Sequence, residues 1–107
     1  MSAVVPAPPS VVAFATLDDL AAFVHLTLCQ LDHLEPTQTP LRRVPLTRHR
    51  RPCGVVFHVE GPRLLRTSAV WTADDSRIIF YNSTGERVRE VRLSEAPDPA
   101  ETAKRAA

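Results

Sequence analysis

Hydrophobic residues recur at helical spacing through residues 16–34. Thr16 is a good N-cap, and acidic residues in the first turn suit the positive end of the helix dipole. Pro36 ends the segment because the residue before a proline is pushed out of the α region. The pattern predicts one helix with a single strongly apolar face. At roughly 100° per residue, that face carries Leu17, Leu20, Ala21, Val24, Leu28 and Leu31.

Residues 53–94 alternate between apolar and polar positions in four short segments. The connections between these segments are short and contain Gly, Pro, Asp or Ser, which favour turns. Short connections force antiparallel neighbours, so we expect a four-stranded antiparallel meander. Alternation places the larger apolar side chains on one face, namely Val55, Phe57, Val59, Leu65, Ala69, Trp71, Ile78, Phe80, Val91 and Leu93.

The second face of the expected sheet is mixed in character. We expect the helix to cover the first face, which gives an α+β fold of two layers: one N-terminal helix packed on a four-stranded antiparallel meander. The second face is more apolar than a simple solvated surface, which indicates cover by the proline-rich segment or by another subunit. Its side chains are Val56, His58, Glu60, Arg66, Ser68, Val70, Ile79, Tyr81, Glu90 and Arg92.

Chain length and proline positions predict one domain between two tails. The chain has 107 residues, and its prolines fall outside the expected helix and strands. We expect disordered tails over residues 1–10 and 95–107, since Pro, Ala and charge cannot form a core. The domain then spans residues 11–94, divided into the helix at 16–34, a Pro/Arg-rich connector at 35–52 and the sheet at 53–94.

The net charge of +1 is too near neutral to indicate a partner, but the basic residues are unevenly placed. No acidic residue occurs between Pro36 and Gly54, and a mobile basic connector would attract a phosphate backbone. The segment lacks aromatic residues for base stacking and contains no named nucleic-acid motif. The favoured interpretation is a solvated connector whose arginine content reflects codon usage. Binding of nucleic acid or another polyanion, and binding to an acidic patch of a partner protein, are the two alternatives. The arginines of the segment are Arg42, Arg43, Arg48, Arg50 and Arg51.

Cysteine and histidine spacing raises the question of a metal site. Cys29, His33, Cys53 and His58 would make a four-ligand set of the kind that zinc uses. Strand parity separates Cys53 from His58, and the helix face with His25, Cys29 and His33 points away from the apolar stripe. We therefore expect no metal. The favoured interpretation is that His25 and His33 are solvated and that the cysteines are small, mostly apolar fillers. The alternative is that His25, Cys29 and His33 form a helix stripe that faces a partner.

Enzymatic activity is not expected from these residues. Three scattered glycines make neither a P-loop nor a dinucleotide fingerprint. The pairs Cys53 with His58 and Ser68 with His58 lack an activating third group. No cofactor is expected.

The remaining expectations concern location and function. No apolar run is long enough to cross a membrane, and the first residues do not resemble a secretory signal, so we expect a cytoplasmic protein. The favoured function is a non-catalytic protein-interaction or self-association module, with a homo-oligomer as one form of it. The alternative is binding of nucleic acid or another polyanion through residues 42–51.

Overall fold

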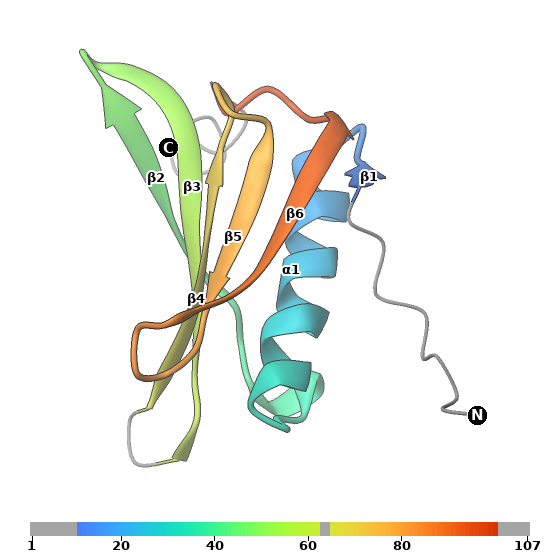
Figure 1. Ribbon diagram of the computed structural model, residues 1–107, viewed down its shortest axis with the longest axis vertical. Helices are drawn as coiled ribbons and strands as arrows, with labels where there is room; N and C mark the ends of the chain where they lie inside the picture. The colour runs from blue at the N-terminus through green and yellow to red at the C-terminus, as the bar shows by residue number, and fades with distance from the viewer. Residues whose placement is uncertain (1–10, 63–64, 101–107) are drawn as a thin grey trace.

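The computed structural model describes residues 11–62 and 65–100. The expected tail at 1–10 and residues 101–107 of the tail expected at 95–107 lie outside the described residues, whereas Glu95 is the last residue of a strand. The described elements follow one another along the chain as shown in Figure 1. They are β1 (Val11–Ala13), α1 (Leu17–Leu31), a short 3-10 helix η1 (Pro36–Gln38), β2 (Arg42–Arg48), β3 (Arg51–Glu60), β4 (Arg66–Thr72), β5 (Arg77–Tyr81) and β6 (Arg87–Glu95).

One sheet forms the second layer of the molecule, and α1 packs against one of its faces (Figure 1). The strand order is β1-β6-β5-β4-β3-β2. Strands β2 to β6 are antiparallel neighbours, whereas β1 pairs with β6 in parallel. The α+β class is confirmed. The prediction of a four-stranded, purely antiparallel sheet is wrong, because the sheet has six strands and is mixed.

Both missed strands lie at sheet edges. β2 occupies the segment expected to be a connector, and Pro45 within it pairs with Val55 of β3. An edge strand tolerates proline because the missing N–H can point away from its only neighbour. β1 has three residues, which is too short for alternation to be recognised. In both cases pairing with another strand, rather than an alternating pattern, defines the strand: β2 forms a hairpin with β3, and β1 pairs with the distant β6.

The ends of α1 are fixed by side-chain and backbone capping. The side chain of Thr16 accepts a hydrogen bond from the backbone N–H of Asp19 at 3.1 Å, as the N-cap prediction requires. The helix ends at Leu31 rather than at residue 34. His33 adopts a φ of 54°, and the backbone N–H of Leu34 donates to the carbonyl of Cys29 at 2.7 Å. This Schellman-type C-cap ends α1 at Leu31, so the helix is terminated by its own cap rather than by Pro36 as expected.

The core lies between α1 and the covered face of the sheet. The expected helix stripe is buried, apart from the half-buried Leu31, and so is the expected core face except for one residue. Leu65 is 50% exposed because it precedes the first residue of β4. Thr67 takes the buried position instead and is 0% exposed. Alternation therefore identified the correct face of every strand from β3 to β6.

Candidate functional site

The face of the sheet opposite α1 carries a continuous row of apolar side chains; we call this face the open face. In register, Val44 of β2 lies opposite Val56 of β3, which lies opposite Val70 of β4. Val70 in turn lies opposite Ile79 of β5. Val44 is 51% exposed and the other three are half-buried. Within residues 11–62 and 65–100, the only helix longer than one turn lies on the other face (Figure 1).

The flanks of this row carry paired charges. Arg66 donates to the carboxylate of Glu60 at 2.9 Å, and Arg77 donates to that of Glu90 at 3.0 Å. The hydrogen bond from Arg66 lowers the pKa of Glu60, so this carboxylate stays charged. The centre of the open face is therefore apolar, and Arg66 and Arg77 beside it are paired with carboxylates. Arg42, two residues from Val44 on β2, forms no ion pair among the described residues.

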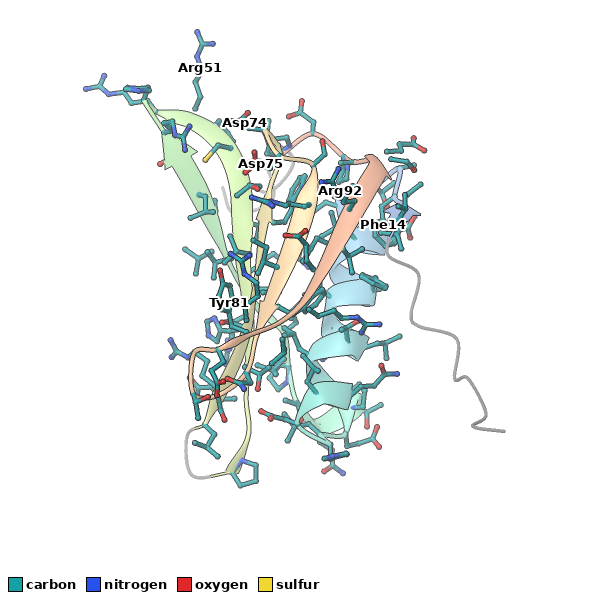
Figure 2. The ribbon with its side chains drawn as sticks, in the orientation of Figure 1. Phe14, Arg51, Asp74, Asp75, Tyr81 and Arg92 are labelled. Carbon is teal, nitrogen blue, oxygen red and sulfur yellow. The ribbon has the colours of Figure 1, made fainter. Side chains whose placement is uncertain are left out.

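A polar row runs beside the apolar row. Arg42 lies opposite His58, His58 opposite Ser68, and Ser68 opposite Tyr81. Figure 2 shows Tyr81 on the side of the sheet away from α1. Burial, followed by the nearby Arg66 and then Arg42, lowers the pKa of His58, while Glu60 opposes the shift. The β2 end of this row borders a shallow pocket of about 530 Å³ lined by Pro40, Arg42, Arg43, Val44, His58 and Glu60.

The turn between β2 and β3 gathers basic residues at an exposed point. Arg48, His49, Arg50 and Arg51 follow one another here, and we call them the basic tip. His49 and Arg50 have φ values of 52° and 66°, the left-handed conformation that both central residues of a type I′ turn require. Arg48 and Arg51 face each other in register, and Arg51 extends away from the molecule in Figure 2. Arg48 forms an exposed 3.7 Å ion pair with Asp74.

The five candidate arginines are divided between the two ends of β2. Arg48, Arg50 and Arg51 belong to the basic tip, whereas Arg42 and Arg43 lie at the start of the strand. A strand rises about 3.3 Å per residue, so roughly 20 Å separates the two groups. The segment expected to be a mobile basic connector is an ordered hairpin with two separate basic ends.

The expected partner-facing stripe on α1 does not form one exposed surface. Cys29 is 1% exposed within the core, and burial, with a smaller contribution from Glu35, raises the pKa of its thiol. Nε2 of His25 lies 2.6 Å from the carbonyl oxygen of Thr39 and the ring is half-buried. Only His33 is exposed. The segment from η1 to Thr39 packs beside the helix, which the helical pattern alone did not reveal.

The described part of the chain brings together no group of three or more His, Cys, Asp or Glu side chains that could hold a metal ion. Cys29 and Cys53 are both free thiols. His58 and Ser68 are cross-strand partners, but no hydrogen bond joins their side chains in the described residues.

Sequence reasoning missed Val44 as part of the candidate surface. Val44 and Leu46 have the spacing of one strand face, but Val44, Pro45 and Leu46 are consecutive apolar residues, so no alternation of apolar and polar positions marked the strand. Proline and arginine concealed it, since both are typical of connectors.

Comparison with known proteins found no match to a family model, to a curated protein or to a solved structure. No helix of the described residues is long and apolar enough to span a membrane. The fold and the surface define the class no further than a small α+β domain in which one sheet face is left without a covering helix by the described residues.

Proposed function

We propose that this chain is a small, non-catalytic cytoplasmic domain that associates with a second copy of itself through the open face. The observation that carries the proposal is the apolar row of Val44, Val56, Val70 and Ile79 across four adjacent strands. An antiparallel sheet with one face in water usually presents polar residues there. Contiguous exposed apolar surface is typical of interaction sites. The free thiols of Cys29 and Cys53 suit a reducing compartment.

Charge pairing on the open face favours sheet-on-sheet packing. Arg66 and Arg77, which flank the row on β4 and β5, already have carboxylate partners on the same chain, and the unpaired Arg42 lies at the β2 end of the face rather than at its centre. Two open faces can therefore meet without burying an unpaired charge at the centre, which would be costly. Two sheets packed in this way lie about 10 Å apart with their side chains interdigitated.

The two edges of the sheet are poorly suited to pairing with another strand, which favours the open face as the contact surface. Pro45 interrupts the outer edge of β2, and arginines flank it at Arg43 and Arg48. Proline and charge on an edge strand oppose the addition of another strand. β1, at the opposite edge, offers three residues. Association through an edge is therefore less favourable than association through the open face.

Sedimentation and native mass spectrometry test this proposal. Wild-type protein should form a dimer, and Val70→Glu should raise its dissociation constant at least about tenfold because a carboxylate would be desolvated at the contact. Leu26→Glu is the matched control, since Leu26 is 52% exposed on α1, outside the open face. Circular dichroism checks that both variants are folded. A monomeric wild type at high concentration, or equal weakening by both substitutions, would refute self-association.

A second candidate function is polyanion binding by the basic tip. The observation that favours it is the facing pair Arg48 and Arg51 at a turn of His49 and Arg50, because like charges in register destabilise a hairpin. Arg50 and Arg51 have no ion pair among the described residues. A phosphate backbone would supply the missing counter-charge.

A labelled single-stranded oligonucleotide tests the basic tip. Affinity should fall steeply with salt, and Arg50→Ala/Arg51→Ala should remove most of it. Arg87→Ala/Arg92→Ala is the control, because it removes the same charge from two exposed arginines of β6. Binding that both double variants weaken equally would exclude the tip as a defined site.

A further inference from the structure

The polar row of Arg42, His58, Ser68 and Tyr81 places four hydrogen-bonding side chains side by side on the open face. Cβ atoms of directly opposed residues on one face lie about 4.5–5.5 Å apart. A guanidinium, an imidazole and two hydroxyl groups therefore project from neighbouring strands into one region. The apolar row accounts for none of these side chains.

The balance of charge around the shallow pocket is positive. Glu60 is the acidic residue in the lining, and Arg66 holds its carboxylate at 2.9 Å. Arg42 and Arg43 line the same pocket, and neither forms an ion pair within the described part of the chain. Because Glu60 is already paired with Arg66, the guanidinium groups of Arg42 and Arg43 have no carboxylate partner among the described residues.

The electrostatic setting of His58 agrees with this balance. Burial is the main cause that lowers the pKa of His58; Arg66 from β4 and, less, Arg42 from β2 lower it further, and Glu60 from β3 raises it. Tyr81 from β5 completes the groups in this row and its neighbourhood. Near pH 7 the imidazole is therefore neutral, with one N–H to donate, and an added anion would favour its protonation.

We propose that this pocket and the adjoining polar row bind a phosphoryl group, with Arg42 as the bidentate anchor and His58 as a donor in the pocket lining. Ser68, which is opposite His58 in the row and outside the lining, is a further hydrogen-bond donor. Arginine matches two oxygens of a phosphoryl group, and hydroxyl and imidazole donors from the adjacent strands satisfy the others. The phosphoryl group belongs either to a free phosphate or to an organic phosphomonoester. The site lies beside the apolar row and does not rest on self-association.

NMR titration with inorganic phosphate and with phenyl phosphate tests this site at constant ionic strength. Phosphate should raise the pKa of His58 by at least about half a unit, because a bound anion stabilises the imidazolium. The largest amide shifts should fall on residues 42–44 and 58–60 and on Ser68. Tighter binding of phenyl phosphate than of phosphate would assign the site to phosphomonoesters, and the reverse order would assign it to the free ion.

Two substitutions with the same change in charge decide the location. Arg42→Gln should weaken binding at least about tenfold. Arg92 lies on β6, near the opposite edge of the sheet from β2, so Arg92→Gln should leave the affinity for phosphate within about twofold of the wild-type value. Arg42→Lys keeps the charge but loses the paired donors, so it should be intermediate. The proposal is overturned if both glutamine variants weaken binding equally, if the pKa of His58 stays fixed, or if the largest shifts lie at the basic tip. If this proposal fails, the dimer test still stands, because that test measures the oligomeric state of the wild type and of Val70→Glu.

Discussion

The hydroxyl of Thr67 in β4 donates a hydrogen bond to the Oδ2 atom of Asp32, the C-cap residue of α1. Thr67 is 0% exposed and Asp32 is half-buried, so this contact ties the end of the helix to the sheet away from bulk water. The two residues are far apart in sequence. Their contact also positions the segment that leads from α1 to β2.

We expect Thr67→Val to lower the free energy of unfolding by about 1–3 kcal/mol, because it retains the shape but leaves the carboxylate without its buried donor. Asp32→Ala should also destabilise, and the double variant should lose less than the sum of the two single changes. Urea unfolding monitored by Trp71, the only tryptophan, measures all three. If the losses in free energy of unfolding from the two single variants add up to the loss in the double variant, the hydrogen bond contributes nothing to stability.

Gly54 is required by the close approach of β3 to β4. A Cβ atom at this position would lie 2.0 Å from the backbone oxygen of Trp71. Gly54→Ala should therefore cost at least about 3 kcal/mol, because backbone atoms must shift. Gly61→Ala is the control, since its Cβ would meet only the flexible side chain of Leu34 at 3.2 Å. Equal thermal stability of the two variants would contradict this explanation.

The turn of the β2–β3 hairpin is not optimised for stability. His49 and Arg50 both have positive φ, a conformation that costs a side-chain-bearing residue about 1–2 kcal/mol. Asn-Gly is the preferred pair for this turn. We expect His49→Asn/Arg50→Gly to raise the free energy of unfolding by about 1 kcal/mol. Chemical denaturation checks this, and a less stable variant would show that the tip residues make contacts of their own.

His58 makes stability depend on pH in a defined range. Its pKa in the folded protein is lower than the ordinary value of 6.5, so the unfolded chain binds the proton more readily. Its contribution is complete above pH 6.5 and is lost as the pH falls through the folded pKa. The contribution of Glu60, whose pKa is also lowered, is lost only below its ordinary value of 4.5.

The free energy of unfolding should therefore decrease between pH 7 and pH 5, and His58→Gln should flatten that decrease. Urea titrations at a series of pH values measure both slopes. His33→Gln is the matched control, because His33 is exposed at the end of α1. The same flattening in the His33 variant would refute the assignment to His58.

The sequence by itself determined the helix, its N-cap and the buried face of the four central strands. These features depend on local periodicity and on contacts within a few residues, as Thr16 with Asp19 and the alternation around Trp71 illustrate. The apolar character of the second face, with Val56, Val70 and Ile79, was also evident before the structure.

Only the tertiary structure decided which segments complete the sheet and which side chains meet. Val44 joined the apolar row because β2 pairs with β3, and Arg42 reached His58 for the same reason. Cys29 became part of the buried core, and His25 is half-buried where the chain after α1 folds back and Thr39 meets its ring. The basic residues separated into two groups because an extended strand spans the distance between them. Each outcome depends on how one segment of the chain folds or packs against another, which the apolar–polar pattern of a single segment does not encode.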